Sequence, residues 1–165
     1  MQYSPNPQPN EAEASKNNRE VVRKVMTAFN TAEVSILDEV ISPQIVQHSN
    51  HPIPANGDAV AALKKEILLP HAAYPDGQFT EGITISEGDM IFYAWDFAGT
   101  NTGSVMGRPA SGKRLTLHAG EVARIKDGKV VEHWDEWLKP RLEAMLWAGQ
   151  LDDTLLTQFT KAGLV

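Results

Sequence analysis

A change of periodicity at Gly77 constrains the fold of this chain more than any other feature of the sequence. Before Gly77, apolar residues recur at helical spacing. After it, they alternate with polar residues, as in strands with one buried face. We expect strands over about 78–87, 89–101, 113–126 and 129–138. Turn signals separate them at Glu87-Gly88-Asp89, Ser111-Gly112 and Asp127-Gly128. Helices, then consecutive strands, then helices predict an α+β domain.

Helix signals flank the predicted strands. Asn17 and Glu20 resemble a capping box and precede one apolar stripe, made by Val22, Val25, Met26 and Phe29. A short second helix is expected over about 32–41. A third is expected from an Asp58 cap to about Leu69, where Pro70 would end it. The segment between the second and third helices reads as a loop or a short strand.

The ends of the chain complete the expected domain organisation. Residues 1–14 hold three prolines among polar residues and are predicted to be a disordered tail. Residues 15–165 are expected to form a single domain with a C-terminal helical extension. In that extension one helix would begin at Pro140, and a last one would be capped by Asp152 or Asp153.

Composition excludes several classes of function. The net charge is −6 and the basic residues are scattered, which argues against nucleic acid as a partner. There is no cysteine, so disulfides, thiolate nucleophiles and zinc–thiolate sites are excluded. No apolar run reaches the about 18 residues needed to span a membrane, and the N-terminus lacks the pattern of a signal peptide. We therefore expect a cytoplasmic protein without a membrane partner.

The strand over 113–126 carries one ionisable residue on an apolar face. Its inward face would hold Leu115, Leu117, Ala119, Glu121, Ala123 and Ile125. A lone carboxylate on such a face must reach a partner or line a wet cavity, because burial of an unpaired carboxylate costs several kcal/mol. Glu121 is therefore a candidate site residue.

Two registers of the following hairpin decide which residues accompany Glu121. A two-residue turn at Asp127-Gly128 would place Trp134 opposite Glu121. A three-residue loop with a left-handed Gly128 would place His133 opposite Glu121, and Asp135 opposite Ala119. The three-residue loop is favoured by packing, because it turns His133 and Asp135 inward and leaves two further glutamates outside.

Several motifs resemble those of the SnoaL-like polyketide cyclases, also called ester cyclases, of the nuclear-transport-factor-two-like superfamily. The resemblance covers about residues 18–140. It rests on "IVQHSNHP", on "YPDGQFTEGITISEGDM" and on the run from "FAGTNTGSVMGRP" to "KDGKVVEHWDEW". It implies a curved antiparallel sheet wrapped by helices around a conical pocket, a cystatin-like α+β barrel that usually forms a homodimer.

The resemblance also implies residue roles. Asp135 matches an aspartate that acts as general acid/base in an intramolecular aldol ring closure, without metal or cofactor. Glu121 stands where relatives commonly carry histidine, and Asn101 stands at the histidine of "GTHTG". His48 matches a common "V-x-H" position, in a segment that borders the pocket in the family. The family pairing agrees with an inward Asp135 and His133.

These residues predict acid/base chemistry in an apolar pocket. If Glu121 and Asp135 share a water-poor cavity, the pKa of one of them should rise towards neutrality, which suits removal of an acidic C–H. His133 would hold the enolate or orient Asp135. Flat apolar walls for a small hydrophobic or aromatic ligand would come from Tyr93, Trp95, Phe97 and Trp137.

Two other functions remain open at this point. The same pocket would serve a binding module without catalysis, or a hydrolase in the manner of limonene epoxide hydrolase. The spacing of His48 and His51 is not taken as a metal site, because no third ligand is placed near them. We also expect a homodimer, since the outer face holds the apolar residues Phe92, Ala94, Val122 and Trp134.

Overall fold

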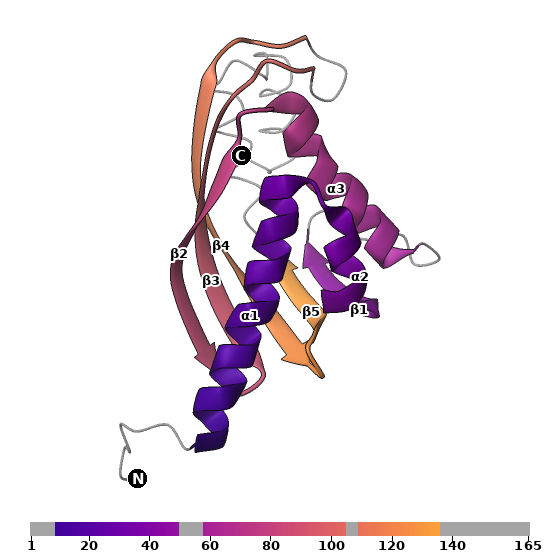
Figure 1. Cartoon of the computed structure of the whole chain (residues 1–165), viewed down its shortest axis with the longest axis vertical. Coiled ribbons are helices and arrows are strands. Elements are labelled where there is room, and N and C mark those ends of the chain that lie inside the picture. Colours follow the sequence, from indigo (N-terminus) through magenta and orange to yellow (C-terminus); the bar gives the residue numbers. More distant parts are fainter. Residues whose placement is uncertain (1–8, 50–57, 105–108, 136–165) are drawn as a thin grey trace, which may run out of the picture.

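The structure, a computed structural model, describes residues 9–49, 58–104 and 109–135. Within these residues the fold is α+β, as predicted, with α-helices on one face of a curved five-stranded sheet (Figure 1). The elements in chain order are α1 (Pro9–Thr31), the 3-10 helix η1 (Val34–Ile36), α2 (Leu37–Val40), β1 (Ile41–Ser49), α3 (Ala59–Ala73), β2 (Gln78–Glu87), β3 (Met90–Thr100), β4 (Arg114–Lys126) and β5 (Lys129–Asp135).

The strand order is β1-β5-β4-β3-β2. Strands β2 to β5 form an antiparallel meander, and β1 joins the far edge parallel to β5. The four predicted strands of the meander are confirmed within a few residues at each end. The remaining strand, β1, lies where the sequence left a loop or a short strand as alternatives.

The hydrophobic core fills the space between the sheet and the helices. It includes Val22 and Met26 from the predicted stripe of α1, and Ile67 of α3. From the sheet, Ile91 and Ala123 point into the same core. Full burial of a large aliphatic side chain contributes about 1.5–3 kcal/mol, so this layer holds the helices on the concave side of the sheet.

Helix α1 begins at Pro9 and therefore includes residues 9–14 of the predicted tail. Proline is compatible with the first turn of a helix, because the N–H groups there have no intrahelical acceptor. The buried Asn18 lies within α1, where its side-chain amide donates to Ser86 Oγ and to the carbonyl of Gly88, both at 3.0 Å. These bonds tie α1 to the turn between β2 and β3.

Helix α3 begins at the predicted cap but ends later than expected. Asp58 Oδ1 accepts a hydrogen bond of 3.0 Å from the backbone N–H of Ala61. The predicted end at Pro70 is wrong, because the helix continues to Ala73, and Tyr74 N–H donates to the carbonyl of Pro70 at 2.7 Å. The two predicted C-terminal helices lie outside the described residues. No helix in the described part of the chain is long and apolar enough to span a bilayer.

The hairpin between β4 and β5 differs from both predicted registers. Lys126 pairs with Lys129, so the turn has two residues, and φ is +50° at Asp127 and +73° at Gly128. Positive φ at both positions is typical of a type I′ turn. The predicted three-residue loop is therefore wrong. An irregularity follows between Arg124 and Ile125, where Val131 is the extra residue on β5. This bulge restores the predicted phase, with His133 inward.

Candidate functional site

A cavity of about 290 Å³ lies between the helices and the concave face of the sheet. Its walls are mostly apolar and come from α1, α3 and all five strands. Polar side chains reach it at few positions, among them Gln47, Glu66, Glu121 and His133. Such a pocket, apolar with a few polar groups, is the usual form of a site for a small organic ligand.

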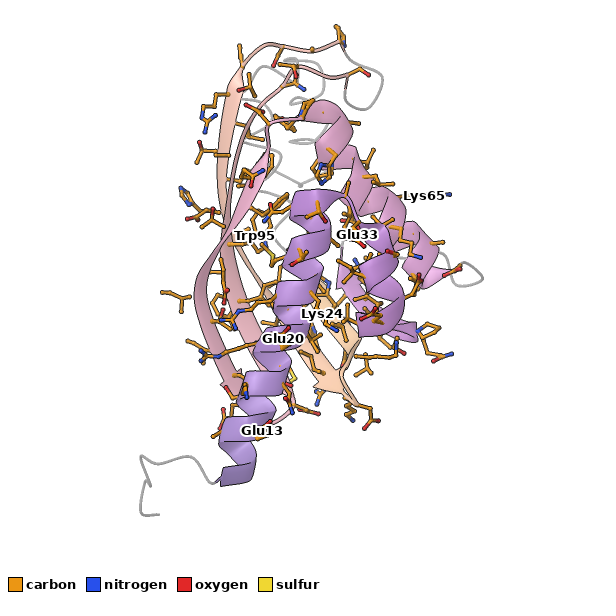
Figure 2. All side chains as sticks on the ribbon, viewed as in Figure 1. Glu13, Glu20, Lys24, Glu33, Lys65 and Trp95 are labelled. Atoms are coloured by element: carbon orange, nitrogen blue, oxygen red, sulfur yellow. The ribbon has the colours of Figure 1, made fainter. Side chains whose placement is uncertain are left out.

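The predicted aromatic wall lines this cavity. Tyr93, Trp95 and Phe97 occupy alternate positions of β3, are buried, and face the helices. In Figure 2 the labelled Trp95 lies between the sheet and the helices. Phe79 of β2 packs against the rings of Trp95 and Phe97, with centroid distances of 5.2 Å and 4.7 Å. These contacts give the cavity a rigid wall of flat rings.

Glu121 of β4 is the acceptor at the centre of a polar cluster. Tyr93 lies directly opposite it on β3, and the tyrosine hydroxyl donates to Oε2 at 2.7 Å. Trp95 Nε1–H donates to Oε1 at 3.0 Å. His133 Nε2 lies 2.9 Å from Oε2 and 3.3 Å from the hydroxyl of Tyr93. We refer to these four residues as the Glu121 cluster.

The hydrogen bonds of the Glu121 cluster define what it can do chemically. Glu121 is only 8% exposed, and a carboxylate at that depth is costly unless donors surround it. The hydroxyl of Tyr93 and the indole N–H of Trp95 donate to the carboxylate, and His133 Nε2 completes the cluster at 2.9 Å. A carboxylate, a phenol and an imidazole in contact can pass a proton at the wall of an apolar cavity.

Residues 19–143 match the SnoaL-like polyketide cyclase family. The chain belongs to this family. It is 27% identical over 127 residues to the aklanonic acid methyl ester cyclase DauD of Streptomyces sp. (strain C5), covering 72% of this chain and 76% of DauD.

Solved structures show the same fold. AclR, a candidate hydroxylase from Streptomyces galilaeus, superposes with a TM-score of 0.67 at 26% identity, over 84% of this chain and 99% of AclR. IdmH, a candidate polyketide cyclase from Streptomyces antibioticus, gives 0.64 at 24% identity, over 81% of this chain and 99% of IdmH.

Two residues predicted for the site, Asp135 and Trp137, have side chains outside the described part of the structure. Asp135 is the last described residue of β5, and its backbone pairs with Ser49 of β1. Its side chain lies outside the description, so the predicted contact between two carboxylates stays a prediction. Trp137 also lies outside the described residues.

His48 occupies the opposite face of the sheet from the cavity. Its Nε2 lies 2.8 Å from Glu132 Oε1, and its ring stacks on Trp134 with centroids 4.9 Å apart and planes 10° apart. The predicted role of His48 in the pocket is therefore not supported by the geometry. The reason is strand alternation, because His48 pairs with the outward Trp134 while Gln47 pairs with the inward His133.

Gln47, like Glu66 of α3, is a polar cavity residue that sequence reasoning missed. It follows Ile45, which also lines the cavity, at the two-residue spacing of a strand. The signal was present as the alternation of Ile45 and Gln47 with the outward Val46 and His48. The prolines on either side of this segment concealed it.

An ionic network covers the outer face beside His48. Glu132 Oε2 accepts from Arg124 Nε at 2.9 Å, and Arg124 Nη1 donates to Asp89 at 3.1 Å. Hydrogen bonds from His48 and then from Arg124 lower the pKa of Glu132, and bonds to Glu132 and Asp89 raise the pKa of Arg124. The network joins β4 and β5 to the edge strand β1 and lies away from the cavity.

Asn101, where the family resemblance implies a histidine, has a structural environment. It is fully buried, and its amide donates to the carbonyls of Ala73 at 3.1 Å and Gly103 at 2.8 Å. Its side-chain oxygen accepts from Ser111 N–H at 2.7 Å. Asn101 therefore fastens the segment after β3 to the end of α3, and it is not among the residues that line the cavity.

Proposed function

We propose that this protein is a cofactor-free acid/base enzyme that closes a ring in a small hydrophobic carbonyl compound by intramolecular aldol addition. The observation that carries the proposal is the Glu121 cluster, which sets an exchangeable proton at the wall of an otherwise apolar cavity. Membership of a polyketide cyclase family supports the reaction class. The family fixes the fold more firmly than the substrate, so the substrate is part of the proposal.

In the proposed reaction, Asp135 is the general base. It takes a proton from a carbon between two carbonyl groups, and the resulting enolate carbon attacks a ketone of the same molecule. One C–H bond breaks, one C–C bond forms, and the ketone oxygen becomes an alkoxide. Asp135 follows His133 by two residues on β5, and the period of a strand predicts the same face of the sheet for both.

The second half of the reaction needs an acid, and we assign it to His133. Its imidazolium would deliver a proton to the alkoxide, and Glu121 would stabilise that imidazolium across the 2.9 Å contact. Glu121 itself is a poor choice for the base, because it already accepts from Tyr93, Trp95 and His133. The three donors would have to be displaced before it could take a proton from carbon.

A binding module without catalysis is the second candidate function. The contacts of Glu121 with three protein side chains favour it, because such a cluster also stabilises a folded pocket without any chemistry. An epoxide-hydrolase-like reaction would need an arginine or asparagine beside the carboxylates. Neither residue type lines the cavity within the described residues.

The test uses the substrate named for DauD, aklanonic acid methyl ester, as the first compound. Aldol closure leaves the mass unchanged, so the product is detected by a shifted chromatographic retention at the same mass. Asp135→Asn should abolish turnover and leave the melting temperature nearly unchanged. Asp96→Asn is the matched control, because Asp96 lies exposed on the outer face and bonds to His118 at 2.6 Å.

The outcomes separate the two candidates. Turnover by the wild type and by Asp96→Asn, with none by Asp135→Asn, supports the enzyme. Full activity of Asp135→Asn would remove Asp135 from the mechanism. Saturable binding of the compound by the wild type, with no conversion, would favour the binding module.

A further inference from the structure

We propose that Gln47 is a specificity-determining residue that binds a second oxygen of the ligand, next to the oxygen addressed by His133. The inference rests on the proposed function, in which the ligand is a carbonyl compound. It adds a ligand class, namely compounds with two neighbouring oxygen substituents such as β-diketones. It assigns recognition of the second oxygen to a residue outside the Glu121 cluster.

The position of Gln47 is set by the parallel pairing of β1 with β5. Gln47 pairs with His133, and both side chains line the cavity. Side chains at paired positions of neighbouring strands stand side by side, at the strand spacing of about 4.8 Å. Two polar groups at that separation address two different atoms of one ligand.

The outer face keeps this register in place. His48 is held on the far side of the sheet by Glu132 and by its stack on Trp134. A slip of β1 by one residue would break both contacts and would turn the exposed Val46 and His48 into the cavity. The contacts of His48 on the outer face therefore fix the register that points Gln47 into the cavity.

The chemistry of the glutamine side chain defines what it recognises. The amide is neutral, and it both donates and accepts hydrogen bonds. It cannot take a proton from carbon, so it serves orientation and not proton transfer. Its amide N–H can donate to a carbonyl oxygen, and its amide oxygen can accept from the hydroxyl of an enol. Both forms of a β-diketone are therefore recognised by one side chain.

The test compares two ligands that differ by one carbonyl group. Benzoylacetone has a ketone where butyrophenone has a methylene, and the two share the phenyl ketone. Isothermal titration calorimetry with the wild type should show tighter binding of benzoylacetone. In Gln47→Leu the ratio of the two affinities should fall by about three- to tenfold, the value of one net hydrogen bond, with butyrophenone little changed.

Two further variants make the result decisive. Gln47→Glu keeps the size of the side chain and loses the amide donor, so it should also reduce the ratio if Gln47→Leu fails to fold. Val46→Thr, at an exposed outer position of the same strand, should leave the ratio at the wild-type value. An unchanged ratio in both Gln47 variants overturns the inference, and so does a wild type that binds neither compound. The measurement needs no turnover, so loss of the proposed aldol reaction would not be mistaken for loss of this site.

Discussion

The hydrogen bond between Tyr93 and Glu121 allows a quantitative test of the candidate site without any substrate. Both residues are buried, and the hydroxyl lies 2.7 Å from the carboxylate oxygen. A hydrogen bond to a charged group contributes about 1.5–3 kcal/mol to stability. Tyr93→Phe removes the hydroxyl and keeps the ring in the wall. Glu121 retains the donors of Trp95 and His133 in this variant, so the expected loss is that of one bond.

The measurement is thermal unfolding, arranged as a double-mutant cycle. For a chain of 165 residues, 1 kcal/mol corresponds to about 2–4 °C in the melting temperature, so Tyr93→Phe should lower it by about 3–12 °C. In a Glu121→Leu background the hydroxyl has lost its 2.7 Å bond to the carboxylate. There the same substitution should cost little, or should even raise the melting temperature.

The comparison of the two backgrounds shows whether the hydroxyl of Tyr93 couples to Glu121. If Tyr93→Phe lowers stability equally in both, the hydroxyl does not couple to Glu121, and the proposed cluster is refuted. If coupling is found, Glu121 accepts the hydrogen bond of Tyr93 in solution, and the cluster exists as described.

Two further predictions concern the outer face of the sheet. Because bonds from His48 and Arg124 lower the pKa of Glu132, their stabilisation is complete above its ordinary value of 4.5 and is lost as the pH falls through the lowered value. Glu132→Gln should therefore melt below the wild type at neutral pH, and the gap should close only below about pH 4.5; parallel curves down to about pH 3 would contradict this. Phe92, Val122 and Trp134 form one paired row on this face, so we predict a homodimer that Trp134→Glu converts to a monomer in size-exclusion light scattering, whereas Thr116→Glu, outside the row, does not.

The sequence predicted the meander because each of its strands has one apolar face. On β4, Leu115, Ala123 and Ile125 face the core as alternation requires, and Glu121 interrupts that face. The strand pattern alone therefore predicts Glu121 as a site residue. Its partners were less certain, because Tyr93 and Trp95 also satisfy the pattern of a plain hydrophobic core.

The register of the β4–β5 hairpin and the edge strand β1 could not be predicted from the sequence, for physical reasons. Asp127-Gly128 is compatible with turns of two or three residues, and a bulge at Val131 leaves no mark in the local chemistry. The predicted phase of His133 was nevertheless correct, because burial of an imidazole with one glutamate is less costly than burial of three glutamates. Strand β1 is held by its pairing with β5, a contact distant in sequence, so His48 was given the face that belongs to Gln47.

The pairing of β4 with β5 explains how a glutamate can stand at position 121. The family resemblance implies a histidine at this position on β4, and its replacement by a carboxylate removes that imidazole from β4. In this chain an imidazole reaches the same place from β5, because His133 Nε2 lies 2.9 Å from Glu121. A cationic ring and a carboxylate can therefore both be present, with the ring carried by the neighbouring strand. Glu121 and His133 then act as one unit, and removal of either should abolish the acid function assigned to His133.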